Sequence, residues 1–307
     1  MGKSKFIMTR VIIIAVFTAL CTALTHVQVK MPTGDMVHLG NFVMIMSALL
    51  LGGIEGGLVG SLGMGIYDLI YYSSKPSTII RTFILKFLIG FIVGFVFRLI
   101  LKKKLNTTKL LIGATSFFGL LFVFSLILFL IGDRSDLTFK TGLLAYVSNF
   151  LGSGKTVKVS LYIPIFSFLF ALGMTLAVIF SSKMTERRKA ALFAITLAIL
   201  VNILGEFLLR WLLEGIFNTY VSEISNGFSV SLVTATSKIP GSLITGFISV
   251  ILAIAIYEPV YLGVKNLPQF KKNNKLEDRE EEKEETTESS VQISEDNNNT
   301  NELSHQN

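Results

Sequence analysis

Residues 37–72 read VHLGNFVMIMSALLLGGIEGGLVGSLGMGIYDLIYY and decide the fold of this chain. The stretch predicts two apolar helices joined by a glycine-rich turn, with polar side chains near the two ends that would lie side by side. Glycines let membrane helices pack closely, and polar side chains in such helices are candidates for binding. We therefore interpret the stretch as part of a membrane-embedded protein that binds a small polar molecule. Its polar residues are His38, Asn41, Tyr67 and Asp68.

The composition of the whole chain also indicates a membrane protein. Of its 307 residues, 51% are hydrophobic and only 16% are charged, whereas about 25% of the residues in a soluble domain are charged. Several apolar runs approach the roughly 20 residues that cross a bilayer. The sequence thus predicts an all-α, polytopic membrane protein with about eight transmembrane helices. The predicted spans are residues 9–28, 37–53, 56–73, 79–101, 110–131, 160–181, 190–213 and 239–262.

Clusters of Lys and Arg predict the orientation of these spans. With the N-terminus inside, every cluster falls on the cytoplasmic side, as positive residues do in membrane proteins. We therefore expect a multi-pass protein of the cell membrane with cytoplasmic termini and outward loops at 29–36, 74–78, 132–159 and 214–238. The first span lacks a following small-residue cleavage site, so we expect a retained helix rather than a signal peptide. The clusters lie within residues 3–10, 98–109, 183–189 and 265–275.

The net charge of +7 hides an asymmetry between the two ends of the chain. Residues 276–307 hold 11 acidic and 2 basic side chains, a balance of −9, so the rest of the chain carries +16. That excess lies at the helix ends and predicts no nucleic-acid partner. The polar segment 265–307 cannot bury enough apolar surface to fold, and we expect a disordered acidic cytoplasmic tail.

Ionisable and amide side chains in the predicted spans are the candidate substrate-binding residues. Arg81 and Lys86 would form a cationic patch for a carboxylate or phosphate if both point inward, although Lys86 could instead extend to the membrane surface. Glu206 and Arg210 are four residues apart and can form an ion pair, either structural or functional. The candidates are His38, Asn41, Asp68, Arg81, Lys86, Glu206, Arg210, Lys238 and Ser242.

Four of these positions carry further expectations. His38 and Asn41, three residues apart, would share one helical face near the outer surface. Asp68 is a solvated boundary residue, a ligand acceptor, or an ion-pair partner of Arg81 or Lys86. We expect Asn41→Ala and Arg81→Ala each to weaken ligand binding without unfolding the protein.

The first span carries small residues at intervals of four, which we call the alanine stripe: Ala15, Ala19 and Ala23. The stripe suits either docking of another protein or packing within this chain. No enzyme motif accompanies these features. The segment GSGKT at 152–156 lacks the glycine at position 149 that a P-loop requires, and the histidines lack zinc-site spacing. We expect no enzymatic activity, no metal and no cofactor.

The order of these features resembles the S component of an energy-coupling factor (ECF) transporter, the substrate-binding membrane subunit of a vitamin importer. S components usually have six helices, so the resemblance implies four core helices in 1–105, an inserted pair with an outward loop in 106–189, and the last two core helices in 190–264. Relatives often have Pro-Lys where this chain has Ile54-Glu55, and often Asn at Ser242. The resemblance is carried by the alanine stripe and by residues 37–41, 49–52, 60–68, 81–90, 202–214 and 239–242.

The resemblance also implies partners and a mechanism. An S component captures a vitamin or related micronutrient from the outer face, here under a loop at 29–36. It associates with a transmembrane coupling protein and two cytoplasmic ATPases, and ATP hydrolysis drives its reorientation. The alanine stripe would then meet the coupling protein. Arg81 and Lys86 suggest an anionic cargo, such as a pantothenate- or folate-like molecule.

Two functions from other classes remain open. One is a secondary transporter driven by an ion gradient, with Glu206 as the coupled group. Two halves related by inverted topology would favour it, but residues 1–104 and 110–262 show no convincing repeat. The other is a membrane scaffold that transports nothing and binds no ligand.

Overall fold

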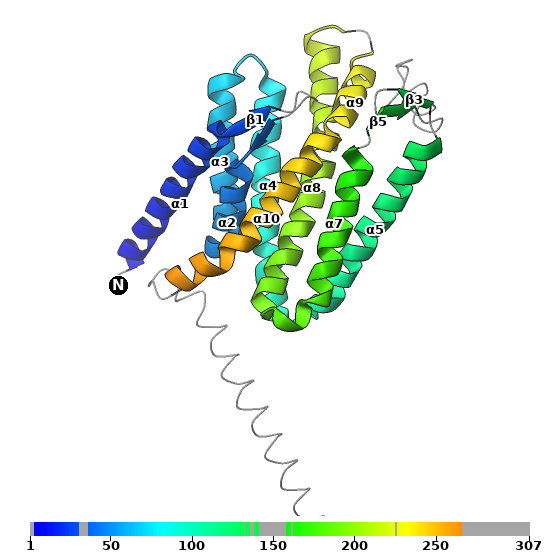
Figure 1. Cartoon of the computed structure of the whole chain (residues 1–307). Helices are drawn as coiled ribbons and strands as arrows, with labels where there is room; N and C mark the ends of the chain where they lie inside the picture. Colours follow the sequence, from blue (N-terminus) through cyan, green and yellow to red (C-terminus); the bar gives the residue numbers. More distant parts are fainter. Residues whose placement is uncertain are drawn as a thin grey trace, which may run out of the picture. The chain divides into compact units, whose positions relative to one another are not determined.

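The computed structural model describes residues 3–30, 36–131, 133–135, 138–140, 158–160, 162–224 and 226–265. The chain divides after Pro259 into two compact units, and of the second only 260–265 are described, as the end of the last helix and a turn residue. The helices are α1 (Lys3–His26), α2 (Gly40–Leu51), α3 (Gly53–Tyr71), α4 (Pro76–Lys103), α5 (Thr107–Ile131), α7 (Tyr162–Ile179), α8 (Glu186–Ile216), α9 (Gly227–Ser237) and α10 (Ile239–Val264) (Figure 1).

Helix α4 is the centre of the first unit. It packs against α3 on one side and α8 on the other, α1 and α2 pack against α3, and α5 packs against α7 (Figure 1). Its apolar residues recur every four positions, so they form one buried stripe: Leu85, Ile89, Val93 and Phe97. Helix α10 closes this core, because its Tyr257 ring meets the Phe97 ring edge-on, with centroids 5.8 Å apart.

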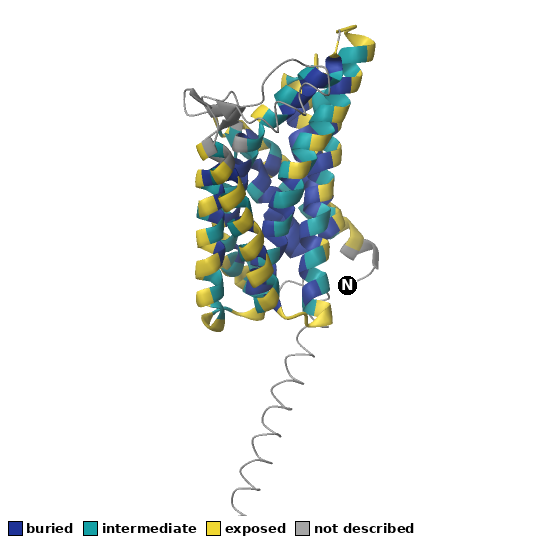
Figure 2. Ribbon diagram, turned by 90° about the vertical axis from the view of Figure 1, so that its right-hand side faces the viewer, coloured by how far each residue is buried: buried dark blue, intermediate teal, exposed yellow. Residues whose placement is uncertain are grey.

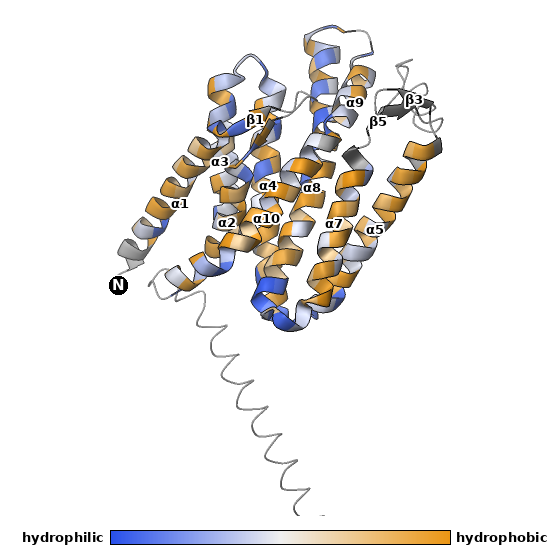
Figure 3. Ribbon diagram, viewed as in Figure 1, coloured by the Kyte–Doolittle hydropathy of each residue, from blue (hydrophilic) through white to orange (hydrophobic). Residues whose placement is uncertain are grey.

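The outer surface of the helices is apolar, as expected for a protein in lipid. Val16 is 61% exposed, Leu120 72% and Ile179 63%, and Figure 2 shows exposed residues along the outer sides of helices whose inner sides are buried. Figure 3 shows apolar residues along the helices, with polar residues at the upper ends of α3, α4 and α8 and at the turn between α7 and α8. The chain is therefore an all-α helical membrane protein, which confirms the predicted fold class.

A helix lies at each of the eight predicted spans, although not all reach transmembrane length. In the described part of the chain, five helical segments are long and apolar enough to cross a membrane. The span predicted at 37–53 is shorter than expected, because α2 has only 12 residues. A helix of that length extends about 18 Å, less than the roughly 30 Å of a bilayer core. The five segments are Ile7–His26, Pro76–Lys103, Thr107–Ile127, Glu186–Val221 and Gly227–Val264.

The loop predicted at 214–238 is wrong as a loop, because it contains the end of α8, a π-helical turn η2 (Phe217–Val221) and helix α9. The sequence of α9, GFSVSLVTATS, is rich in Ser and Thr and gives a weak apolar pattern. Its hydroxyl groups donate to carbonyls four residues back: Ser231 to Gly227, Thr234 to Val230 and Thr236 to Leu232. The sequence did not predict this helix, because Ser and Thr are poor helix formers and the segment lacks a clear apolar periodicity.

Short strands occupy parts of two other predicted loops. Strands β1 (Gln28–Lys30) and β2 (Met36–His38) form an antiparallel hairpin between α1 and α2. Strands β3 (Asp133–Ser135), β4 (Thr138–Lys140) and β5 (Lys158–Ser160) form an antiparallel sheet between α5 and α7. The remainder of the 29–36 loop, the GSGKT segment and the acidic tail lie outside the described residues. A short 3₁₀ turn, η1 (Ser181–Lys183), leads from α7 toward α8.

Glycines bring α3 and α4 into close contact. Gly52 has a φ of 122°, a conformation that favours glycine, and it makes the whole connection between α2 and α3. A Cβ atom on Gly90 would lie only 2.5 Å from the carbonyl carbon of Gly56, and one on Gly94 would fall on the backbone of Gly53. This close approach fixes α4 against α3, which helps to place the polar residues at the start of α4 beside the end of α3.

Candidate functional site

A cavity of about 340 Å³ lies where the ends of several helices and the β1–β2 hairpin meet. Cavities for small organic ligands typically have volumes of about 300–1,000 Å³. All nine residues predicted to bind substrate line this cavity: His38, Asn41, Asp68, Arg81, Lys86, Glu206, Arg210, Lys238 and Ser242. They come from α2, α3, α4, α8, α10, strand β2 and the α9–α10 junction. The structure thus brings the predicted set together, and their contact with substrate remains a prediction.

Three buried residues line the cavity side by side in the contacts below, and we call them the cavity floor: Asn41, Lys86 and Asn202. Lys86 is only 6% exposed, and its Nζ donates to Asn202 Oδ1 at 3.1 Å. Of the two orientations considered for Lys86, the inward one is therefore observed. Asn41 and Asn202 also line a cavity of about 20 Å³ whose other walls are mostly apolar. Asn41 and Asn202 therefore line both the polar cavity and the smaller, mostly apolar one.

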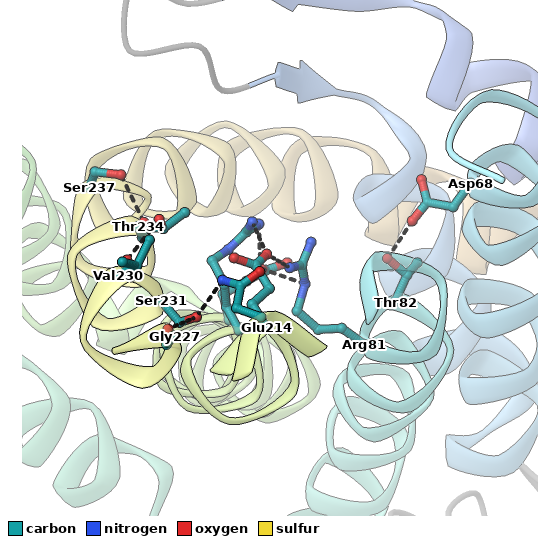
Figure 4. A network of polar contacts seen from close by, with 12 residues as sticks. Asp68, Arg81, Thr82, Glu214, Gly227, Val230, Ser231, Thr234 and Ser237 are labelled. Carbon is teal, nitrogen blue, oxygen red and sulfur yellow. Dashed lines mark hydrogen bonds and ion pairs between the residues drawn. The ribbon is translucent and has the colours of Figure 1, made fainter. Parts of the chain in front are cut away.

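Two arginines and two glutamates form an ion-pair network beside the floor, the Arg–Glu cluster (Figure 4). Arg81 contacts Glu206 through Nε at 3.2 Å and Glu214 through Nη1 at 3.1 Å. Arg210 contacts the same two carboxylates, at 3.3 Å and 2.8 Å. The predicted Glu206–Arg210 pair is therefore present, but it is half of a four-residue cluster that joins α4 to α8. Glu214 was not among the candidates, although its spacing of four from Arg210 could have revealed it.

Asp68 faces the same cavity from the end of α3. Its Oδ2 accepts a hydrogen bond from Thr82 Oγ1 at 2.5 Å (Figure 4). In the part of the chain that the structure describes, Asp68 makes no ion pair with Arg81 or Lys86, one of the alternatives considered for it. At 9% exposure it is also not a solvated boundary residue. Asp68 is thus held in place by a neutral neighbour on α4.

His38 reaches the cavity by a different route from the predicted one. It lies in strand β2, opposite Gln28 in the hairpin, and not on a helical face shared with Asn41. The prediction of a shared face was wrong because α2 begins only at Gly40. Burial, with Lys86 nearby, lowers the pKa of His38 to about 3, so its ring is neutral at physiological pH. The hairpin therefore presents an uncharged imidazole to the cavity.

Besides the Nε atoms of Arg81 and Arg210, three buried side-chain polar atoms of residues that line the cavity make no hydrogen bond to the described residues. They are Gln28 Oε1, His38 Nδ1 and Asn41 Oδ1. Buried polar atoms normally have a partner. All three residues line the cavity, although the three atoms themselves have almost no accessible surface.

Several residues that line the cavity were not predicted from the sequence. Thr78, Thr82 and Lys86 recur every four residues on α4, and this spacing could have identified the two threonines once Lys86 was chosen. Tyr72 was not predicted either, yet it lines the cavity. Gln28 gave no signal in the sequence, because only the folded hairpin brings it opposite His38. The unpredicted lining residues are Thr25, Gln28, Met64, Tyr67, Tyr72, Lys75, Thr78, Thr82, Asn202, Gly241 and Thr245.

The alanine stripe faces away from the other helices. Ala15, Ala19 and Ala23 are all exposed. Helix α1 contacts its neighbours through another face, where Thr22 Oγ1 donates to Gly63 O at 2.9 Å and Cys21 Sγ lies 3.4 Å from Gly40 O. Packing within the chain, one of the two interpretations of the stripe, is therefore not what the structure shows.

Helices α5 and α7 stand apart from the cavity. They pack against each other, with the Phe118 and Phe170 rings stacked at 4.8 Å. In the described part of the chain, no residue of either helix lines the cavity. The cavity is built from residues before 87 and after 201.

A helical membrane protein with a polar cavity of this size belongs to the class of membrane-embedded small-molecule binding proteins. Its sequence matches the ECF-type riboflavin transporter S component family over residues 5–162, and the chain belongs to that family. The match extends from α1 through α5 to the start of α7. No curated protein and no solved structure matches the chain. S components are transporter subunits and not enzymes, so the expected transport role and the absence of enzymatic activity are both confirmed.

Proposed function

We propose that this chain captures a vitamin or related small organic micronutrient at the outer face of the membrane, as the substrate-binding subunit of an ATP-driven ECF importer. The observation that carries the proposal is that all nine residues predicted to bind substrate line one cavity. The family is named for riboflavin transport, so riboflavin is the first candidate ligand.

The charge distribution along α4 supports an outward-facing cavity. Arg81 and Lys86 line the cavity from the first part of this helix, whereas Lys102 and Lys103 lie in its last turn. Clusters of basic residues favour the cytoplasmic side. The first part of α4 therefore binds ligand near the outer face, and the basic residues at its other end lie at the cytoplasmic face. In this arrangement both termini of the chain are cytoplasmic.

The exposed alanine stripe supports a docking site for a partner helix. Small side chains allow two membrane helices to approach closely, and α1 presents three of them outward. In the proposed transporter this face meets the transmembrane coupling protein, which joins the chain to two cytoplasmic ATPases. The chain itself contributes binding and reorientation, and the ATPases supply the energy.

The distance of α5 and α7 from the cavity supports the division inferred from the sequence. Residues 1–105 and 190–264 form the binding core in this proposal, and 106–189 are an added helix pair with an outward loop. The family match continues past residue 105, so the added pair begins within the matched region.

Affinity purification of the tagged chain from its native membrane, followed by mass spectrometry, tests the proposed assembly. We expect two ATPases and one membrane coupling protein to be recovered with the chain. Repeated recovery of no ATPase, in detergents that keep other ATP-driven transporters intact, would contradict the assembly and favour an ion-driven transporter. Titration of the purified chain with riboflavin then tests the first candidate ligand separately.

A further inference from the structure

We infer that the ligand of this cavity carries an anionic group, a carboxylate or a phosphate, that Lys86 binds at the cavity floor. The inference rests on the proposed function and specifies its substrate class. Riboflavin is uncharged at neutral pH, so an anionic ligand would differ from the vitamin for which the family is named. It also assigns the anion to Lys86 rather than to the arginines.

The Arg–Glu cluster has no net charge. Each guanidinium group contacts both carboxylates, at 2.8–3.3 Å. Two positive and two negative charges therefore balance within the cluster. An anion that approached Arg81 would have to compete with carboxylates already in place. The cluster thus acts as a brace between α4 and α8, and it is not the anion site.

Lys86 is in a different situation from the arginines. Its ammonium group has three donors, and its one hydrogen bond among the described residues goes to the neutral oxygen of Asn202. No carboxylate of the described residues lies within ion-pairing distance of Nζ. A buried charge is costly unless it is paired and hydrogen-bonded. An anionic group of the ligand would supply the missing acceptor and the counter-charge together.

Other charges around the cavity favour the same class of ligand. Outside the Arg–Glu cluster, three cationic side chains line the cavity, Lys75, Lys86 and Lys238, against the single carboxylate of Asp68. Glu206 belongs to the charge-balanced Arg–Glu cluster, and Asp68 accepts a hydrogen bond from Thr82. Lys75 and Lys238 add positive charge outside the floor. A lining with excess positive charge attracts an anion toward the cavity.

Two matched pairs of compounds test the inference on the purified full-length chain. Riboflavin and riboflavin 5′-phosphate differ by a phosphate, and panthenol and pantothenate differ by a carboxylate in place of a hydroxymethyl group. In at least one pair we expect the anionic member to bind about tenfold more tightly or better, as measured by titration calorimetry. The pair that shows the preference identifies the anion as phosphate or carboxylate.

Variants of Lys86 assign the preference to its side chain. Lys86→Gln should reduce the preference to less than about threefold, and Lys86→Arg should retain most of it, because the charge remains. Lys102→Gln is the matched control, since Lys102 is exposed in the last turn of the same helix, and it should leave the preference unchanged. A preference that survives in Lys86→Gln would overturn the assignment.

The remaining outcomes also decide the inference. Binding of the neutral member as tightly as the anionic one would overturn it, and so would no binding of either pair. In both cases the proposed function would stand if the same preparation still contained the coupling protein and the ATPases. Loss of those partners with ligand binding intact would instead count against the proposed assembly alone.

Discussion

Asn41 and Arg81 were both predicted to bind ligand, but their contacts in the structure differ. Both are buried and both line the cavity. The side-chain oxygen of Asn41 has no partner among the described residues, whereas Arg81 holds two carboxylates of α8. Substitution of the first residue should therefore affect the ligand, and substitution of the second should affect the protein as well.

Asn41→Ala should weaken ligand binding about five- to tenfold, the size expected for one hydrogen bond. Thermal stability should change little, because Oδ1 makes no hydrogen bond that the change would break among the described residues. Titration calorimetry and the melting temperature in detergent measure both effects. Ser47→Ala is a suitable control, since Ser47 is buried in the same helix away from the cavity. Equal affinity in Asn41→Ala and the wild type would remove Asn41 from the site.

Arg81→Ala should destabilise the protein by about 3 kcal/mol, because it leaves two carboxylates with a single arginine. This expectation differs from the one based on the sequence, in which Arg81→Ala weakened binding without loss of stability. Thermal unfolding of Arg81→Ala beside Arg81→Lys separates the loss of charge from the loss of the two-carboxylate contact. A melting temperature equal to that of the wild type in Arg81→Ala would show that the Arg–Glu cluster does not brace α4 and α8.

At the scale of elements, the packing of α3 against α4 is the feature on which the cavity depends. Glycines at Gly53, Gly56, Gly90 and Gly94 let the two backbones meet directly. The polar start of α4 consequently lies against the end of α3, where Thr82 reaches Asp68. Helix α8 then adds its own polar face through the Arg–Glu cluster.

Gly94→Ala should destabilise the protein by about 1–3 kcal/mol, because the added methyl group would fall on the backbone of Gly53. Gly113→Ala is a matched control in α5, where a Cβ atom meets nothing within 4 Å. Alanine is the better helix former by up to about 1 kcal/mol, so the control should be neutral or slightly stabilising. Melting temperatures of the two variants in the same detergent check the difference. Equal shifts in both would argue against close α3–α4 packing.

At the scale of the whole molecule, the inner and outer faces of α1 have separate tasks. Thr25 lines the cavity, and the strand that follows α1 brings Gln28 to it. The alanine stripe is exposed on the same helix. A partner bound to the stripe would therefore contact the helix that leads directly into the cavity wall.

Ala19→Phe should reduce recovery of the coupling protein and the ATPases by about tenfold, because a bulky side chain prevents close approach of a partner helix. Ligand affinity of the isolated chain should be unchanged. Leu120→Phe, at a position on α5 that is 72% exposed, controls for an added ring on a surface that faces lipid. Quantitative mass spectrometry of the purified complexes measures recovery. Full recovery with Ala19→Phe would place the docking surface elsewhere.

The sequence by itself determined the membrane class, the positions of the main helices and the nine candidate residues. Apolar runs near bilayer length and ionisable residues within them are local signals, and they do not depend on how the chain folds. The glycines of residues 52–65 also predicted close helix packing, because small residues let the backbones of membrane helices approach one another.

Only the tertiary structure decided which charges are paired, which way Lys86 points and where His38 lies. Glu214 joins Arg81 across 133 residues of chain, and Lys86 meets Asn202 across 116. Such pairings depend on which helix packs beside which, and no local pattern specifies that. The strand at His38 was missed because hairpin pairing depends on the folded chain, and the helix at Gly227–Ser237 was missed because its Ser- and Thr-rich sequence gives only a weak apolar pattern.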